Sequence, residues 1–285
     1  MIVALAPLPD IMLEPLVRTA LLEDLGRAGD VTTAALMPKD RPWRASLIAR
    51  QKGVVAGLDL ARLAFRLMDP AAQFDVKKPD GSFVKAGDVI ATVKGAARGI
   101  LIAERTALNF LCHLSGIATA TRALVEAARP HKPRICCTRK TTPGLRVVEK
   151  YAVRAGGGAN HRFGLDDAVL IKDNHIAVAG GLRQAVFAAR AAVGHLVKVE
   201  LEVDTLKQVK EALDLPIDAI MFDNMDAAKL AKAVKLVGGR FVTEASGNMT
   251  IKTVKAIAST GVGVISSGSI THSAPILDIG LDDMA

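Results

Sequence analysis

The sequence contains few cysteines and few aromatic residues. Three cysteines among 285 residues, two of them adjacent at Cys136 and Cys137, cannot build a disulfide framework and fit a reducing cytoplasm. No Cys/His pair has the spacing of zinc ligands. Because aromatic residues make up only 4% of the chain, platforms that stack the bases of single-stranded nucleic acid are hard to build.

Long apolar runs and dense basic runs are also absent. Hydrophobic residues make up 50% of the chain, but no apolar stretch approaches the ~20 residues of a membrane-spanning helix. The apolar start of the chain lacks a basic segment and is interrupted by Pro7 and Pro9, which argues against a signal peptide. We expect a soluble, cytoplasmic protein with no membrane partner.

The charge balance of the chain is basic. Lysine and arginine number 37 against 29 aspartate and glutamate residues, which gives a net charge of +8. Such an excess suits nucleic acids, anionic surfaces or small anionic substrates. Because basic clusters and stacking aromatics are lacking, we expect small anionic substrates and no nucleic acid. A generally basic surface is the plainer alternative.

The pattern of expected helices and strands divides the chain into two domains. Residues 1–111 mix helical patterns with short alternating strands, an α+β arrangement that the C-terminal segment 274–285 is expected to join. From 112 to 273, apolar strands and helices alternate with a repeat of about 21 residues, the length of a minimal strand-plus-helix unit. A complete eight-fold barrel usually needs ~250 residues. We therefore expect an α/β fold with an incomplete, open barrel of about six parallel strands.

One expected strand carries an unusual charge pattern. Lys198, Glu200, Glu202 and Asp204 alternate with apolar residues, and the next strand is apolar until Asp223. Parallel sheets flanked by helices are covered on both faces, where an unpaired charge is costly. The pattern therefore predicts an anionic site, unless this strand is a wetted edge. Asp204 is expected to cap the following helix.

Polar residues follow all six strands of the expected barrel. The carboxyl ends of parallel strands meet at one edge, where the active sites of such folds form. The segments concerned are Thr138-Arg139-Lys140, Lys172-Asp173-Asn174-His175, Glu202-Val203-Asp204, Asp223-Asn224, Glu244-Ala245-Ser246-Gly247-Asn248 and Ser266-Ser267-Gly268-Ser269. We predict one active site at this edge.

These residues suggest three kinds of ligand. Glu202 and Asp223 offer the oxygen ligands that Mg²⁺ prefers, through water and substrate. Two Gly-rich loops, at Gly247 and Gly268, let backbone N–H groups approach phosphate, with helix capping as the alternative. Five cations exceed what phosphate needs and predict a second, carboxylated substrate, with solvated surface cations as the alternative. The cations are Arg139, Lys140, His161, Arg162 and Lys172.

Six motifs, in order along essentially the whole chain, are highly specific together. They are Glu23-Asp24-Leu25-Gly26 with Gly29-Asp30-Val31-Thr32-Thr33, Ala103-Glu104-Arg105-Thr106-Ala107-Leu108-Asn109, Thr138-Arg139-Lys140-Thr141-Thr142-Pro143-Gly144, Gly156-Gly157-Gly158-Ala159-Asn160-His161-Arg162, Leu170-Ile171-Lys172-Asp173-Asn174-His175 and Gly268-Ser269-Ile270-Thr271-His272-Ser273. With these motifs the chain resembles the quinolinate phosphoribosyltransferase family.

The resemblance implies a fold and an activity. Members of the family have an α/β N-terminal domain and an incomplete α/β barrel, and they work as homodimers. They join quinolinate to the ribose of phosphoribosyl pyrophosphate with Mg²⁺, releasing pyrophosphate and CO₂ and giving nicotinate mononucleotide for NAD biosynthesis. We expect little acid–base chemistry from the protein itself.

The resemblance also implies residue roles. The implied catalytic residues are Lys140, Lys172, Glu202 and Asp223, with the two acids also at the metal. The carboxylates of quinolinate would be held by Arg139, His161, Arg162 and Lys172, with Arg105 supplied by the neighbouring subunit. The other implied substrate-binding residues are Thr138, Ser246, Gly247, Asn248, Ser267, Gly268 and Ser269.

Departures from the family's pattern are small, and three alternatives stay open. Arg27-Ala28 lengthens an early loop and Phe222 stands where Leu is usual, and neither removes a functional group. The alternatives are a phosphoribosyltransferase for a monocarboxylate such as nicotinate, a barrel aldolase with a Schiff base on Lys172, and a non-enzymatic nucleic-acid binder.

Overall fold

The computed structural model describes residues 5–38 and 41–284, which form two compact units. The first unit holds the described residues up to Arg122, together with Thr142–Gly157 and those from Ser273 onward; the second holds Ala123–Thr141 and Gly158–His272. Residues 112–122 and 142–157, expected in the barrel domain, thus group with the first unit. The C-terminal segment groups with the first unit too.

An antiparallel sheet forms the centre of the first unit. Its strand order is β12-β1-β5-β3, and β12, from the end of the chain, pairs with β1 with Leu281 opposite Leu47. The strands are β1 (Pro42–Ala49), β3 (Gln73–Val76), β5 (Val89–Ala96) and β12 (Ile279–Asp283), beside a small pair of β2 (Gly53–Val54) and β4 (Phe83–Val84). The helices are α1 (Asp10–Leu25), α2 (Val31–Leu36), α3 (Leu58–Met68), α4 (Ala97–Ala127, of which 123–127 belong to the second unit) and α5 (Arg146–Ala155).

Six parallel strands form the sheet of the second unit, in the order β6-β11-β10-β9-β8-β7. The strands are β6 (Arg134–Cys136), β7 (Val169–Ile171), β8 (Val199–Val203), β9 (Ala219–Asp223), β10 (Val242–Ser246) and β11 (Val264–Ser266). Among the described strands, β6 and β7 each have a neighbour on one side only, so the sheet is open. This confirms the expected fold class.

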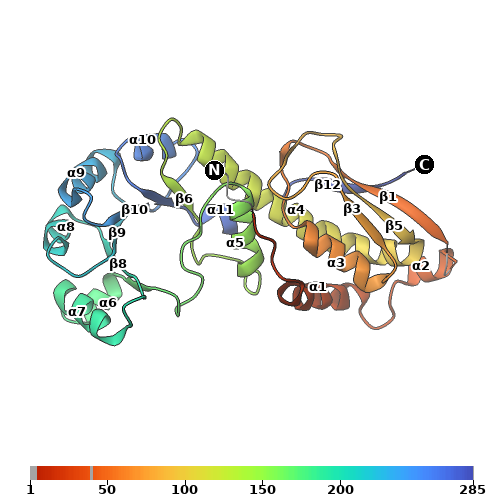
Figure 1. The fold of residues 1–285 in the computed structure, drawn as a ribbon, viewed down its shortest axis with the longest axis horizontal. Helices are drawn as coiled ribbons and strands as arrows, with labels where there is room; N and C mark the ends of the chain where they lie inside the picture. Colours follow the sequence, from red (N-terminus) through yellow and green to blue (C-terminus); the bar gives the residue numbers. More distant parts are fainter. Residues whose placement is uncertain (1–4, 39–40, 285) are drawn as a thin grey trace. The chain divides into compact units, whose positions relative to one another are not determined.

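Helices lie around the outside of these strands (Figure 1). They are α6 (Asp173–Val178), α7 (Leu182–Ala192), α8 (Leu206–Ala212), α9 (Ala227–Val237) and α10 (Val254–Ala258), whereas the short α11 (Ser269–His272) follows β11 at the strand ends. Leu230, Ala233 and Val237 of α9 recur at helical spacing and are buried, and the side chain of Asp226 accepts the Lys229 N–H at the start of the helix. Such amphipathic helices cover one face of the sheet and leave its strand ends free.

The start of α8 corrects one expectation. Thr205, and not Asp204, caps this helix: the Thr205 hydroxyl accepts the Gln208 N–H, and the Gln208 side chain accepts the Thr205 N–H in return. A threonine with Gln three residues later satisfies two N–H groups at once, which a preceding aspartate cannot do. No helix in the described ranges is both long and apolar enough to cross a membrane.

Candidate active site

A cavity of about 840 Å³ lies within the second unit, at the carboxyl ends of the parallel strands. Every barrel residue with a predicted catalytic, substrate-binding or metal-holding role lines this cavity. These residues are Thr138, Arg139, Lys140, His161, Arg162, Lys172, Glu202, Asp223, Ser246, Gly247, Asn248, Ser267, Gly268 and Ser269. The lining residues do not include Asp173, Asn174, His175 and Asp204 of the polar segments at the strand ends. Arg105 lies in the first unit, exposed on α4, and its role across a subunit interface stays a prediction.

The cavity also contains residues to which the sequence assigned no role. They are Leu170, Met221, Asn224, Glu244, Met249, Thr250, Ser266 and His272. Glu244 and Ser266 are the first residues of two of the polar segments that the sequence analysis placed at the strand ends. The period-2 spacing of a strand places Glu244 on the same face as Ser246, a signal that could have identified it.

Glu202 and Asp223 lie on neighbouring strands, with Glu202 opposite Met221 in the register of β8 and β9. Burial raises the pKa of Glu202, and the charge of Asp223 raises it further, while Lys172, whose Nζ lies 3.7 Å from Glu202 Oε2, opposes the shift. The Asn224 amide donates to Asp223 Oδ2 at 2.7 Å. Two partly buried carboxylates that repel each other are the oxygen donors that fit a divalent cation such as Mg²⁺.

The two Gly-rich loops leave their backbones open to the cavity. Gly247 has φ +99°, and a Cβ there would lie 2.1 Å from Asn224 Oδ1. A Cβ on Gly268 would lie 2.9 Å from Cδ of Lys140, whose carbonyl accepts the Thr271 hydroxyl at 2.7 Å. Gly247 needs glycine for its backbone conformation and its close contact, and the small Gly268 lets Lys140 lie against the second loop.

Helix capping does not explain the first of these loops. The N-cap of α10 is Thr253, whose N–H the Thr250 hydroxyl accepts at 3.3 Å, so Thr250 has a capping contact, but Ser246 and Asn248 lie well before this helix start. In the second loop the Ser267 and Ser269 hydroxyls lie 2.8 Å apart. Hydroxyl and backbone donors that face a cavity suit an anionic group, as the sequence predicted.

Four buried polar atoms have no hydrogen-bond partner among the described residues, and all four belong to residues that line the cavity. They are Arg139 Nε, Arg162 Nε, Glu244 Oε1 and Ser266 Oγ. Burial lowers the pKa of Arg162, and the charge of Arg139 lowers it further. Buried polar groups are almost always paired, so this concentration indicates a site built around a polar ligand, and the two arginine donors suit an anionic one.

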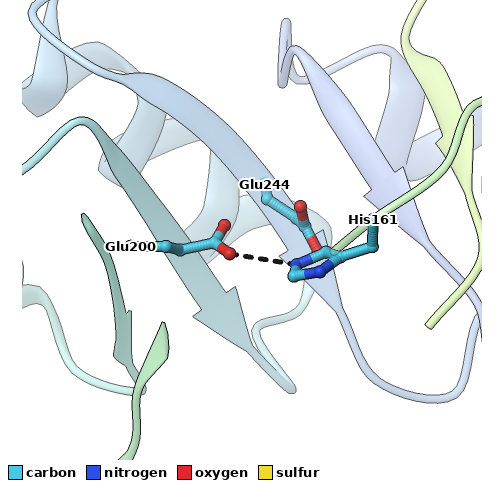
Figure 2. A group of neighbouring side chains, drawn as sticks. All are labelled: His161, Glu200 and Glu244. Carbon is cyan, nitrogen blue, oxygen red and sulfur yellow. Dashed lines mark hydrogen bonds and ion pairs between the residues drawn. The ribbon is translucent and has the colours of Figure 1, made fainter. Parts of the chain in front are cut away.

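Deep in the barrel, His161 faces two acids, Glu200 and Glu244 (Figure 2). His161 Nε2 lies 3.0 Å from Glu200 Oε2 and 3.7 Å from Glu244 Oε1. Burial, followed by the charge of Glu200, raises the pKa of Glu244 to about 7. The sequence pattern predicted Glu200 as part of an anionic strand. It did not predict the contact with His161, because the two residues lie far apart in the chain.

Comparisons with known proteins agree with this architecture. Two family profiles match: quinolinate phosphoribosyl transferase, N-terminal domain, over 30–115, and quinolinate phosphoribosyl transferase, C-terminal domain, over 117–282. The chloroplastic carboxylating nicotinate-nucleotide pyrophosphorylase of Oryza sativa subsp. japonica is 46% identical, over 96% of this chain and 78% of the relative. The probable carboxylating nicotinate-nucleotide pyrophosphorylase of Bacillus subtilis (strain 168) is 43% identical, over 95% of this chain and 93% of the relative.

Solved structures extend the likeness to three dimensions. The crystal structure of NadC from Streptococcus pyogenes matches with a TM-score of 0.94 and 40% identity, over 98% of this chain and 100% of that one. The nicotinate-nucleotide pyrophosphorylase from Francisella tularensis matches with a TM-score of 0.92 and 39% identity, over 97% of each chain. The chain belongs to the quinolinate phosphoribosyltransferase family.

Proposed function

We propose that this protein is a carboxylating nicotinate-nucleotide pyrophosphorylase. It transfers the phosphoribosyl group of phosphoribosyl pyrophosphate to quinolinate and releases pyrophosphate and CO₂, giving nicotinate mononucleotide for NAD biosynthesis. The observation that carries this proposal is the meeting, in one cavity, of a cationic cluster, two carboxylates and two Gly-rich loops. Such a cavity suits a diacid and a sugar diphosphate side by side.

The cations on one part of the cavity wall suit the two carboxylates of quinolinate. Arg139 and Arg162 offer planar guanidinium groups that bind carboxylates bidentately, and their unpaired Nε atoms are available donors. Lys172 supplies a compact charge at the end of β7. Fixed positions for both substrates convert a bimolecular step into one within a complex, which supplies a large part of the rate.

Glu202 and Asp223 would hold Mg²⁺ through water and substrate. When bound, the ion neutralises negative charge on the departing pyrophosphate. Lys140, which rests against Gly268, adds a second positive charge near the phosphate loops. The carboxylates of the same two acids would stabilise the positive charge that develops on the ribose ring. This electrostatic stabilisation is strongest in a partly buried site.

We further propose that the active form is a homodimer in which Arg105 of one chain completes the cavity of the other. The exposed position of Arg105 on α4 leaves it available for such a contact. A cytoplasmic location is part of the same proposal, supported by the low cysteine content of the chain.

The deciding experiment measures the release of a labelled carboxyl carbon as CO₂. The purified protein is incubated with phosphoribosyl pyrophosphate, Mg²⁺ and quinolinate labelled in its 2-carboxylate, and labelled CO₂ is counted together with nicotinate mononucleotide. We expect equal amounts of both products. Nucleotide formed from nicotinate but not from quinolinate would identify the monocarboxylate alternative. Covalent trapping of a carbonyl compound on Lys172 by borohydride would favour the aldolase.

A further inference from the structure

Two acidic residues of the barrel interior have no part in the proposed function, on which this inference rests. Glu200 on β8 and Glu244 on β10 both point toward His161 (Figure 2). The three side chains are only 12%, 6% and 13% exposed, respectively. Acidic groups so far removed from water are costly to ionise unless they are paired, so their presence at this place needs a reason.

The hydrogen bonds define the protonation of the His161 ring. The backbone N–H of Arg162 donates to Nδ1 at 2.8 Å, so Nδ1 offers a lone pair and carries no proton. Nε2, 3.0 Å from Glu200 Oε2, is then the nitrogen that bears the proton and donates it to the carboxylate. His161 is thus held as the neutral Nε2–H tautomer, turned toward the two acids.

The same three side chains are close enough together to ligate one metal ion. The bond from Arg162 argues against that use. With Nδ1 accepting the N–H, a metal on Nε2 would leave neither ring nitrogen with a proton, which requires an imidazolate. A hydrogen-bonded cluster satisfies the ring without that cost.

The cluster acts on Arg162, the residue next in the chain. The contact with His161 Nδ1 fixes the backbone amide of Arg162, and the guanidinium Nη1 donates to the Ala168 carbonyl at 2.8 Å. Burial and the charge of Arg139 lower the pKa of Arg162, and the charges of Asp167 and Glu200 oppose that shift. One acid therefore both orients the imidazole and offsets the repulsion between two arginines that line the cavity.

We propose that Glu200 is a positioning residue for the dicarboxylate substrate. Its hydrogen bond holds His161 in one tautomer and one orientation, and through His161 it keeps Arg162 directed at the cavity before the substrate arrives. An arginine already in place loses less conformational entropy when it binds a carboxylate, so the cluster lowers KM for quinolinate in particular.

The test uses Glu200→Ala, with Glu200→Gln as the conservative variant, whose amide oxygen still accepts the Nε2–H bond. In ¹⁵N-histidine-labelled full-length protein, we expect the Nδ1 and Nε2 shifts of His161, assigned with His161→Gln, to move toward a mixture of tautomers in Glu200→Ala and to return in Glu200→Gln. KM for quinolinate rises about tenfold in Glu200→Ala, which corresponds to ~1.4 kcal/mol. KM for phosphoribosyl pyrophosphate changes less than about twofold.

Glu211→Ala, which removes an exposed carboxylate from α8 of the same unit, is the matched control and should behave as wild type. His161 shifts in Glu200→Ala that equal those of the wild type would overturn the proposal. So would equal increases of KM for both substrates, because they indicate a general structural fault. If wild-type protein does not consume quinolinate at all, the proposed function fails, whereas the shifts still report the tautomer.

Discussion

At the scale of single residues, Glu202 and Asp223 are the two acids that we propose hold Mg²⁺ and stabilise the positive charge on the ribose. Under this proposal, replacement of either acid by alanine removes a metal-holding oxygen and a negative charge beside the ribose. We expect kcat to fall roughly 10²-fold or more, because such stabilisation acts mainly in the transition state. KM for quinolinate should change less than about threefold. Steady-state kinetics at saturating Mg²⁺ measure both.

Asp214→Ala serves as the control for this pair, because it removes an exposed carboxylate just beyond α8. Its rate should match the wild type. An unchanged kcat in both Glu202→Ala and Asp223→Ala would contradict the role assigned to these acids.

The carboxyl group of Glu244 should make the stability of the protein depend on pH. Its pKa is raised from the ordinary 4.5 to about 7, first by burial. Below pH 4.5 the carboxyl is protonated in the folded and unfolded chain alike. Between 4.5 and 7 the unfolded chain releases the proton and the folded chain keeps it, so this group's contribution to stability is lost as pH rises.

Glu244→Gln, which keeps the shape and cannot ionise, should therefore gain stability over the wild type as pH rises from 5 to 8, with a plateau above about 7. Between pH 5 and pH 8, the free energy of unfolding of Glu244→Gln should rise relative to the wild type by up to about 3 kcal/mol. Urea unfolding at several pH values measures it, with Glu211→Gln as the control. A difference that stays flat across this range would show that Glu244 ionises normally.

At the scale of elements, the start of α3 in the first unit is capped by Asp80, which lies in a turn beyond the end of that helix in the chain. The half-buried Asp80 accepts the N–H groups of Gly57 and Leu58, at 3.1 and 3.3 Å, and the Tyr151 hydroxyl of α5, at 2.8 Å. Asp80→Ala removes the cap and leaves the hydroxyl unpaired, for which we expect a loss of about 2 kcal/mol in the free energy of unfolding.

Tyr151→Phe is the matched variant for this cap. It removes one hydrogen bond and keeps both cap contacts, so it should cost about 1 kcal/mol or less. Chemical denaturation of both variants makes the comparison. A larger loss in Tyr151→Phe than in Asp80→Ala would mean that packing of the ring, and not the cap, dominates this contact.

Several elements could be predicted from local patterns. Helices 58–68 and 227–237 follow from apolar spacing alone, because one face of each is buried. Glycine is a poor helix former, yet Gly116 lies inside the continuous helix α4, where a Cβ would come 2.2 Å from the Pro275 carbonyl. That glycine serves a close contact with a segment far along the chain, which no local pattern reveals.

The site shows the same division between local and distant information. The cavity residues at strand ends and in Gly-rich loops could be predicted, because polar groups that follow apolar strands are easily recognised in a sequence. Glu244 did not receive a role, because its significance comes from the contact of its carboxyl with His161, 3.7 Å away on another segment. Such contacts depend on strand order, and the order of the sheet places β10 two strands from β8.

At the scale of the whole molecule, the proposed dimer predicts complementation between two defective chains. Arg105→Ala damages the residue that a subunit gives to its partner, and Arg139→Ala damages the residue that it keeps. In a mixed dimer one cavity then lacks both arginines and the other lacks neither. If subunits exchange at random, half of the dimers are mixed and each has one intact site, so about a quarter of wild-type activity returns.

The experiment mixes the two purified variants under conditions that allow exchange and follows the release of CO₂ with time. Each variant alone is expected to be nearly inactive, because Arg105 and Arg139 would each bind a carboxylate of the same substrate. The double variant Arg105→Ala/Arg139→Ala, mixed with wild type, controls for exchange: here mixed dimers hold no site with both arginines intact, so activity falls as exchange proceeds. If the two single variants exchange and recover nothing, each cavity is completed within its own chain, and Arg105 has no part in its partner's site.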